Sequence, residues 1–413
     1  MKLEIDRERL AGELDALGAI SQEPPPVVTR VVFTEADASG REFVKNLCSQ
    51  AGLATRVDAV GNTFARWVGA DPMLAPVGTG SHIDAIPNAG RFDGTVGVLG
   101  GLEAIRALMR AGHQPRRSIE LIVFTSEEPT RFGIGCLGSR LLAGLLDPKW
   151  ASARTDRAGI TLDAARRAAG FEGSLAQVRL LESYYSAFIE LHIEQGPLLE
   201  QWKIPLGIVT AIAAPAGFAV TIQGEGGHAG AVLMPHRHDA FLAAAEIALA
   251  VESSARASGS IDTVGTVGVC EVFPGAVNSV PSRVRMEIDV RDTDESRRDV
   301  MVLKIRQALE EVAQRRGVEA EMEQVNADPP AQCDRRIVET LEQACAAHGL
   351  AFEHMISRAY HDSLFMSRIA PTGMLFIPCR GGVSHRPDEY ASPEAIAQGT
   401  LVLAEALAHL SAQ

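Results

Sequence analysis

The residues of this sequence best suited to chemistry are a histidine and two aspartates in the glycine-rich stretch "GSHIDAIPNAGRFDG". His82 and Asp84 stand two positions apart at the end of a run that is typical of a strand. Because residues i and i+2 of a strand lie on one face, Asp84 can accept the second ring N–H of a metal-bound His82 and fix its tautomer. A glycine-containing loop can return Asp93 to the same place. This spacing is consistent with half of a metal site, and a capped strand end is the alternative.

Two adjacent glutamates, Glu127 and Glu128, close the apolar strand pattern "RRSIELIVFTSEE". Burying two carboxylates side by side costs free energy, because their charges repel and raise the pKa of one of them. A divalent cation removes that cost. One glutamate could then bind the ion while the other, with its raised pKa, acts as a base on a metal-bound water.

Two further histidines lie at strand ends or in loops: His192 in "ELHIEQG" and His385 in "GGVSHRP". Taken singly, each could equally be an ordinary buried or surface histidine. Taken together, the candidates form a ligand set of nitrogen and oxygen atoms without sulfur: His82, Asp93, Glu128, His192 and His385. Such a set suits two ions such as Zn²⁺ or Mn²⁺, and a carboxylate shared by both would be the arrangement of a two-metal hydrolase.

The elements that must position these residues alternate between strand and helix periods from about residue 34 to residue 126. This alternation predicts an α/β fold, in which helices flank a sheet and ligands bind beyond the carboxyl ends of strands. The pattern changes over 211–327, where several alternating strands and two helices indicate a self-contained α+β unit. The sequence therefore predicts one domain, made of 1–210 and 328–413, that is interrupted by an inserted domain at 211–327.

Composition excludes several classes of function. The 413 residues carry a net charge of −13 with no basic block, so nucleic acid is not expected as a partner, because such binding needs Lys and Arg to neutralise phosphates. No apolar run reaches the roughly eighteen residues of a membrane-spanning helix. The N-terminus lacks a signal-peptide pattern, and the six scattered cysteines are typical of reduced thiols. We expect a cytoplasmic protein with neither a nucleic-acid nor a membrane partner.

Seven segments follow one another along the chain: "GSHIDAIPNAGRFDG", "FTSEEPTRFG", "ELHIEQGP", "GGHAGAVLMP", "GAVNSVPSRVRMEIDVRD", "SRAYHDSLFM" and "GGVSHRPDEY". Together they resemble the hydantoinase/carbamoylase branch of the di-metal aminoacylase and carboxypeptidase superfamily. The likeness covers essentially the whole chain. It implies a di-metal aminopeptidase-like catalytic domain of the α/β class with an inserted α+β lid domain. The lid forms the dimer in many members, so a homodimer is implied as well.

The resemblance also implies roles for the candidate metal residues. Two divalent ions per subunit, Mn²⁺ first and Zn²⁺ next, would be held by five side chains: His82, Asp93, Glu128, His192 and His385. Asp93 would bridge the ions, with the histidines at 82 and 192 completing one site and the remaining pair the other. Glu127 would be the general base, and Asp84 would orient His82.

Five other side chains would act on substrate by the same resemblance. Gln195 would contact the ureido group, and His361 would line the pocket. From the lid, His228 would polarise the scissile carbonyl group, while Asn278 and Arg291 would hold the substrate carboxylate. A guanidinium suits this task because it binds a carboxylate through two parallel hydrogen bonds. The alternative for Arg291 is a place in a solvated charged face, since its surroundings are rich in charge.

Members of this branch cleave a ureido C–N bond beside a carboxylate. The implied function is therefore that of a metal-dependent amidohydrolase acting on a small anionic ureido compound. Finer likeness in segments such as "SHIDAIP" and "SGSIDTVGTVG" favours the members that convert ureidoglycolate to glyoxylate, ammonia and CO₂. N-Carbamoyl-L-amino acids and allantoate are the alternative substrates. An N-acylamino-acid hydrolase or an aminopeptidase is a more remote alternative.

Overall fold

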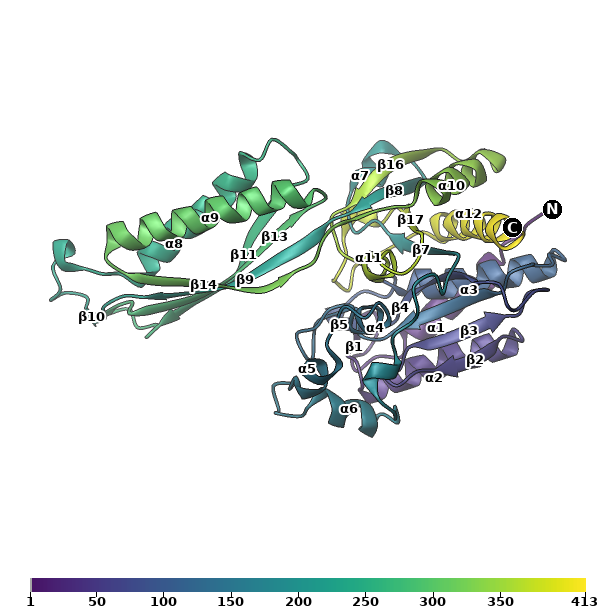
Figure 1. Ribbon diagram of the computed structural model, residues 1–413, viewed down its shortest axis with the longest axis horizontal. Coiled ribbons are helices and arrows are strands. Elements are labelled where there is room, and N and C mark those ends of the chain that lie inside the picture. The colour runs from purple at the N-terminus through teal and green to yellow at the C-terminus, as the bar shows by residue number, and fades with distance from the viewer. Residues whose placement is uncertain (1) are drawn as a thin grey trace. The chain divides into compact units, whose positions relative to one another are not determined.

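The computed structural model describes residues 2–413 and forms two compact units (Figure 1). The units consist of the following ranges: the chain up to Thr210 with Gln332–Met355 and His361–Gln413 in unit 1, and Ala211–Ala331 with Ile356–Tyr360 in unit 2. The segment 211–327, predicted as an inserted domain, falls within unit 2.

The larger sheet has nine strands. Eight follow the order β15 (Ala331–Gln332), β8 (Leu206–Ile212), β17 (Thr372–Ile377), β7 (Ala187–Ile193), β4 (Val77–His82), β6 (Ile119–Phe124), β3 (Thr63–Trp67), β2 (Ala54–Val57), and β16 (Phe352–Ser357) pairs with β8. Neighbours among the four central strands, β17, β7, β4 and β6, run parallel, whereas β3 and β8 pair antiparallel with that group. The carboxyl ends of the four parallel strands therefore meet at one edge of the sheet, where α/β proteins bind ligands.

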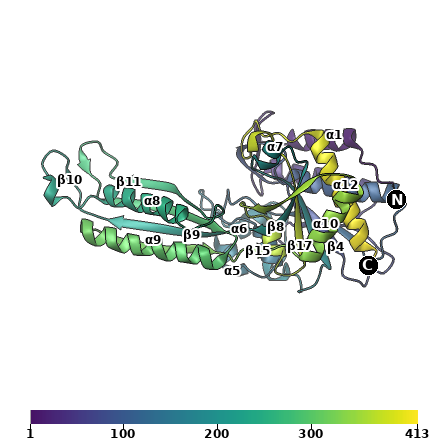
Figure 2. The same ribbon diagram turned by 90° about the horizontal axis from the view of Figure 1, so that it is seen from above.

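Helices cover both faces of this sheet, which explains why the parallel strands are buried along their full length. The long helices of unit 1 are α1 (Arg7–Gly18), α2 (Glu35–Gln50), α3 (Thr95–Arg110), α10 (Arg335–Ala347) and α12 (Pro393–Ser411). Helix α12 packs against α3, α10 and β17. Figure 2 shows α10, α12 and β17 from above. The shorter elements are β1 (Val28–Arg30), β5 (Ala85–Ala89), α4 (Leu137–Leu142), α5 (Pro148–Ala153), α6 (Leu162–Ala168), α7 (Leu198–Trp202), α11 (Asp362–Met366) and the 3₁₀ turns η1 (Leu175–Gln177) and η3 (Arg380–Gly382).

Glycines let helix α3 lie directly on the sheet. A Cβ atom at Gly97 would lie 2.4 Å from the carbonyl oxygen of Leu191 on β7. At the helix N-cap, Gly94 has φ +67°, and a Cβ there would lie 2.5 Å from Nε2 of His82. Larger side chains would push the helix start away from the sheet edge. The glycines that follow Asp93 thus bring this aspartate beside β4 and β7.

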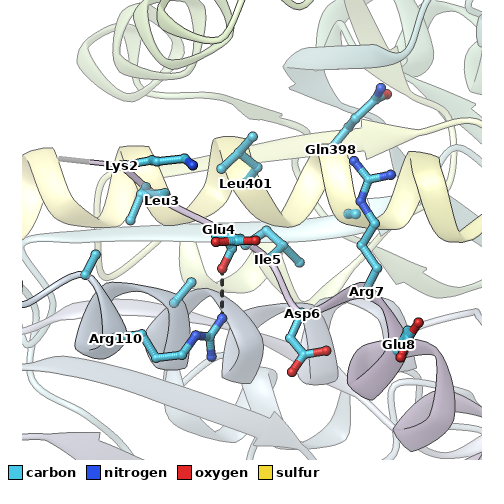
Figure 3. A pocket seen from close by; sticks show the side chains of 13 residues that line it. Lys2, Leu3, Glu4, Ile5, Asp6, Arg7, Glu8, Arg110, Gln398 and Leu401 are labelled. Atoms are coloured by element: carbon cyan, nitrogen blue, oxygen red, sulfur yellow. Dashed lines mark hydrogen bonds between the residues drawn. The ribbon is translucent and has the colours of Figure 1, made fainter.

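A cavity of about 740 Å³ lies where the segment Lys2–Glu8 runs beside α3 and α12 (Figure 3). Arg110 donates a hydrogen bond to the carbonyl oxygen of Glu4 at 2.8 Å within it. None of the residues lining this cavity is a predicted site residue. The cavity is therefore separate from the sheet edge where the parallel strands end.

Unit 2 contains a four-stranded antiparallel sheet in the order β11 (Val264–Phe273), β13 (Arg283–Asp292), β9 (Ala214–Gln223), β14 (Glu319–Ala327). Helices α8 (Ala240–Arg256) and α9 (Glu295–Arg316) pack on one face, so inward residues of β13 alternate strictly with outward ones. A ribbon of β10 (Gly227–His228) and β12 (Ser279–Val280) and the 3₁₀ turn η2 (Met234–His236) complete the unit. Among residues 2–413, no helix is both long and apolar enough to cross a membrane.

Candidate metal centre

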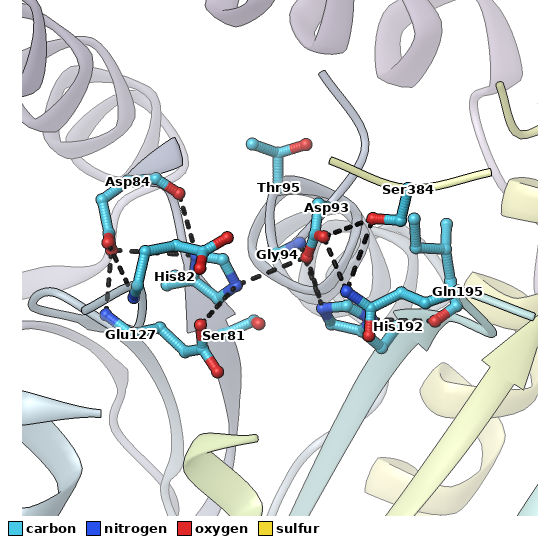
Figure 4. Close-up of polar contacts among 12 residues, drawn as sticks. Ser81, His82, Asp84, Asp93, Gly94, Thr95, Glu127, His192, Gln195 and Ser384 are labelled. Atoms are coloured by element: carbon cyan, nitrogen blue, oxygen red, sulfur yellow. Dashed lines mark hydrogen bonds and ion pairs between the residues drawn. The ribbon is translucent and has the colours of Figure 1, made fainter. Parts of the chain in front are cut away.

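Three neighbouring parallel strands position the candidate ligands at one edge of the sheet. Strand β4 ends at His82, β7 carries His192 next to its last residue, and β6 leads into the glutamate pair. Asp93 lies in the loop before α3, and His385 lies in the loop after η3. The structure therefore brings together five side chains from segments far apart in the sequence. Figure 4 shows three of them, His82, Asp93 and His192.

Asp93 is the centre of this cluster. Its Oδ1 lies 3.2 Å from Nε2 of His192 and 3.6 Å from Nε2 of His82. Its Oδ2 lies 3.3 Å from Nε2 of His385, which in turn lies 3.1 Å from Oε1 of Glu128. These contacts form two triads, each with its ligand atoms within 4.8 Å of one another, and Asp93 belongs to both.

The histidines present the atoms that a metal needs. The Nδ1 atom of His82 faces the carbonyl oxygen of Asp84 at 3.0 Å, and Nδ1 of His192 faces the carbonyl oxygen of Ile193 at 2.9 Å. Each contact fixes one ring proton on Nδ1, so Nε2, which faces Asp93, can bind an ion once it carries no proton of its own. The residues present therefore fit two divalent cations bound by nitrogen and oxygen.

The balance of charges in the cluster also fits the binding of divalent cations. Hydrogen bonds from three histidines hold the pKa of Asp93 well below its usual range, against the effect of burial. Hydrogen bonds to Asp93 and Glu128 raise the pKa of His385 to about 11. Protons on the histidines here balance the buried carboxylates, which is the task a divalent cation performs when it binds such a set.

Asp84 acts differently from the sequence-based expectation. We expected its carboxylate to accept the second ring N–H of His82, but Oδ1 lies 3.7 Å from Nδ1 and the main-chain carbonyl group is the closer acceptor. The carboxylate instead accepts the backbone N–H groups of Glu127 at 3.2 Å and Glu128 at 3.1 Å. Asp84 therefore touches both the first histidine and the glutamate pair, through different atoms.

Glu127 belongs to neither triad. One of its carboxylate oxygens lies 3.9 Å from Nε2 of His82, and the other accepts a weak hydrogen bond from the thiol of Cys136 at 3.5 Å. Burial raises the pKa of Glu127 well above that of an ordinary glutamate. A carboxyl group beside the ligands, with its own oxygen atoms largely unengaged, can move a proton.

Gln195 also reaches the shared aspartate. Its Nε2 donates to Oδ2 of Asp93 at 2.7 Å, while its buried Oε1 has no hydrogen-bond partner among the residues that the structure describes. The ring of His361 packs against the ring of His192, with centroids 4.5 Å apart. Both residues were predicted as site residues, and both lie next to side chains of the candidate triads.

Two residues near Asp93 were missed by the sequence-based reasoning. Ser384 donates to Oδ2 of Asp93 at 2.6 Å, and the carboxylate of Glu389 accepts the backbone N–H of Asp93 at 3.1 Å. The sole sequence signal for these two residues was their closeness to His385 in "GGVSHRPDEY". That closeness does not predict that they contact Asp93.

The predicted substrate residues of unit 2 divide into two groups. Ala229, next to His228, donates to the carbonyl oxygen of Asn278 at 2.9 Å, so these two residues lie together at the β10 ribbon. Arg291 pairs with Asp289 at 2.7 Å and lies over the ring of Tyr360. In the β13 and β9 register it stands at the end opposite the ribbon, eight residues or about 26 Å along the strand.

Comparison with known proteins shows the family to which this chain belongs. A family description, Peptidase family M20/M25/M40, matches residues 78–409, so the chain belongs to this family. It is a hydrolase with the M20-type α/β fold, and the predicted family resemblance is confirmed. An aminopeptidase PepT from Bacillus cereus, at 18% identity and a TM-score of 0.68 over 98% of this chain and 99% of that one, shares the fold.

Within the family the chain is similar to enzymes of ureido compounds. Ureidoglycolate hydrolase from Arabidopsis thaliana is 53% identical over 99% of this chain and 87% of that protein. The N-carbamoyl-L-amino acid amidohydrolase of Geobacillus stearothermophilus is 38% identical over 97% of each. Crystal structures of AtUAH in complex with glyoxylate and with (S)-hydroxyglycine have a TM-score of 0.91 and 52% identity, covering 100% of this chain and 99% of that one.

The two triads predict separable losses of metal. His385→Ala removes a side chain that is 45% exposed and that serves the second triad alone, so we expect bound Mn²⁺ to fall from two ions to one per chain. Elemental analysis after equilibration with Mn²⁺ measures this. His354→Ala, which removes an exposed histidine paired with Glu342, is the matched control and should keep both ions. Retention of two ions by the His385 variant would contradict the assignment.

Proposed function

We propose that this protein is a metal-dependent amidohydrolase that cleaves the ureido C–N bond of a small anionic substrate, with ureidoglycolate as the first candidate. The observation that carries the proposal is the carboxylate of Asp93, which belongs to two ligand triads and so suits a pair of ions acting on one carbonyl group. The identity of 53% to two ureidoglycolate hydrolases supports the substrate. N-Carbamoyl-L-amino acids and allantoate are second candidates, supported by relatives of 33% to 38% identity.

Two divalent ions, Mn²⁺ first and Zn²⁺ next, would be held by the five side chains of the triads. When bound, they supply Lewis-acid activation of water and of the ureido carbonyl oxygen. The ligand set of imidazole and carboxylate groups, without thiolates, supports both metals.

Glu127 is the group placed to move the proton. It stands beside the first triad without belonging to it, and its raised pKa makes the ionised carboxylate a stronger base. In the proposed reaction it takes a proton from the attacking water and returns it to the leaving nitrogen. Gln195 can accept an N–H of the ureido group through its unpartnered Oε1, which would orient the carbonyl carbon toward the water.

The products follow from the balance of atoms. Water adds to the ureido carbonyl carbon, and the terminal nitrogen leaves as ammonia with the proton from Glu127. The remaining carbamic acid loses CO₂, its proton passing to the nitrogen to give hydroxyglycine, and loss of a second ammonia gives glyoxylate. Hydroxyglycine and glyoxylate are the two molecules named in the AtUAH structures.

We propose that a homodimer completes the site and that the lid residues act on the substrate. Arg291 would hold the substrate carboxylate, while His228 and Asn278 would act on the ureido end. The β10 ribbon is joined to the end of β13 at Arg283, which lies eight residues or about 26 Å from Arg291. This is far more than the length of ureidoglycolate, so one lid would not offer both groups to one substrate. His228 and Asn278 would therefore come from the partner subunit.

The surface of unit 2 supports such pairing. Strand β11 is at the edge of its sheet, and its side chains are partly or fully exposed along its length. On the neighbouring helix α8, Leu249 is 64% exposed and Phe241 is 43% exposed. An open strand edge beside exposed apolar side chains is a surface that a second copy of the chain can cover.

We further propose a cytoplasmic protein without a nucleic-acid partner. All six cysteines are free thiols, as expected in a reducing compartment. The net charge of −13 disfavours binding to phosphate backbones.

The substrate is tested by a panel. We expect the Mn²⁺-loaded protein to release ammonia from ureidoglycolate with a kcat/KM at least about tenfold above that for allantoate or N-carbamoyl-L-amino acids, because small pocket differences give selectivity of this size. N-Acetyl amino acids serve as the comparison for an acyl-amide hydrolase. If ureidoglycolate is inert while a carbamoyl amino acid turns over, the first choice of substrate is wrong.

The base is tested by Glu127→Gln. The amide keeps the size of the side chain but cannot take a proton, so kcat should fall about 10²- to 10⁴-fold. Since Glu127 is outside both triads, the variant should still bind two Mn²⁺ ions. Turnover at the parent rate would remove Glu127 from the mechanism.

The dimer is tested by mixing two inactive variants, His228→Ala and Glu127→Gln, after subunit exchange. If each site takes its base from one chain and His228 from the other, mixed dimers regain one intact site, on the order of one quarter of parent activity. Sedimentation velocity checks that dimers are present. Absence of recovery in mixed dimers would show that each lid serves its own chain.

A further inference from the structure

Glu389 lies outside both metal triads yet is almost completely buried beside them, with 4% of its surface exposed. Its Oε1 accepts two backbone N–H groups, from Phe92 at 2.7 Å and from Asp93 at 3.1 Å. Its Oε2 lies within hydrogen-bond distance of the hydroxyl oxygen of Ser384, at 3.0 Å. One side chain thus binds the loop that carries Asp93 and the loop that carries His385.

Ser384 links this carboxylate to the shared ligand. Its Oγ lies 2.6 Å from Oδ2 of Asp93, and Nε2 of Gln195 donates to the same oxygen at 2.7 Å (Figure 4). Oδ1 of Asp93 faces the two histidines of the first triad instead. The orientation of the shared carboxylate is therefore set by polar contacts at both of its oxygens.

The packing around Glu389 leaves it little freedom to move. A Cβ atom at Gly90 would lie 2.3 Å from Cβ of Glu389, so the absence of a side chain there makes room for the glutamate. The ring of Phe92 meets the ring of Tyr390 edge to face, with centroids 6.0 Å apart. The segment 389–390 is thus fastened to the segment 90–93 by apolar as well as polar contacts.

We propose that Glu389 is a positioning residue of the metal centre, which fixes the main chain at Asp93 and, through Ser384, the direction of its carboxylate. Buried backbone N–H groups need acceptors. Removal of the Glu389 side chain would take away the acceptor of the N–H groups of Phe92 and Asp93. Because Asp93 is the one residue common to both triads, its displacement weakens both ion sites. This inference rests on the two-ion centre of the proposed function.

The test compares Glu389→Ala with Glu389→Gln in the full-length protein. The amide oxygen of glutamine can accept the same two N–H groups, and its NH₂ group can donate to Ser384. Glu103→Ala is the matched control, because Glu103 is equally buried in unit 1 and accepts a backbone N–H from Asp6 at 3.0 Å, but lies on α3 away from the ligands. Mn²⁺ affinity is measured by competition with a chelating dye, and thermal unfolding is measured without metal.

We expect Glu389→Ala to bind Mn²⁺ about 10- to 100-fold more weakly than the parent, as is typical when a residue that supports a ligand is removed. Glu389→Gln should restore affinity to within about threefold. Glu103→Ala should lower the unfolding temperature but leave Mn²⁺ affinity unchanged. Parent-like affinity of Glu389→Ala, failure of Glu389→Gln to restore it, or an equal loss in Glu103→Ala would each overturn the proposal.

Amide hydrogen exchange of the metal-free protein separates this inference from the two-ion centre itself. Exchange over residues 90–96 should quicken at least about tenfold in Glu389→Ala and stay at the parent rate in Glu389→Gln and Glu103→Ala. Unchanged exchange in Glu389→Ala would refute the positioning role. A parent protein that binds fewer than two Mn²⁺ ions would refute the two-ion centre, while the exchange result would still decide the role of Glu389.

Discussion

The constraint on which this structure depends is the burial of several carboxylates and imidazoles at one edge of a parallel sheet. Asp93 and Glu128 lie within 3.3 Å of histidine nitrogens, and Glu127 and Asp84 are buried beside them. Charged groups are held in a protein interior only when they are paired. The strand order β7-β4-β6 and the glycines of α3 serve this requirement, because they let three strand ends and one loop converge on a single carboxylate.

Three of the eight non-glycine residues with positive φ in the described part of the chain lie at the same place. Ser126, Gln195 and His385 all have positive φ, at 55°, 54° and 59°, although none is a glycine. Each such residue costs roughly 1 to 2 kcal/mol and persists only where its surroundings impose it. Ser126 directly precedes Glu127, Gln195 contacts Asp93, and His385 belongs to the second triad. The chain therefore accepts unfavourable local geometry where side chains must be aimed at the metal centre.

Much of this centre could be predicted from the sequence, for physical reasons. Histidines and a glutamate pair at the ends of apolar strands are unusual, and parallel strands bring such ends together, so the edge of the sheet could be predicted. The α/β class and the fold of the family were predicted and are confirmed. The prediction that Asp93 belongs to both ion sites came from family resemblance. Strand spacing alone cannot predict where in space a loop residue lies.

Other features depend on contacts that no local pattern encodes. Glu389 meets the backbone of Asp93 across 296 positions of sequence, so its role is visible only once both loops are placed. Asp84 was correctly predicted to contact His82, but through its carboxylate, whereas its main-chain carbonyl oxygen is the closer acceptor. The two oxygens compete for the same imidazole N–H, and the sequence does not show which is nearer. The separation of Arg291 from His228 follows from strand register, which the sequence alone did not fix.

The second triad has a consequence for folding as well as for chemistry. Asp93 and the segment that carries His385 are more than two thirds of the chain apart, since Ser384 follows Asp93 by 291 of the 413 positions. An ion held by both would act as a reversible cross-link that closes a very long loop, and the entropy removed from the unfolded chain grows with the logarithm of that length. Since His385 follows Asp93 so far along the chain, this cross-link can close only after synthesis has passed residue 385. An ion bound by this triad would then report that the two loops have been brought together.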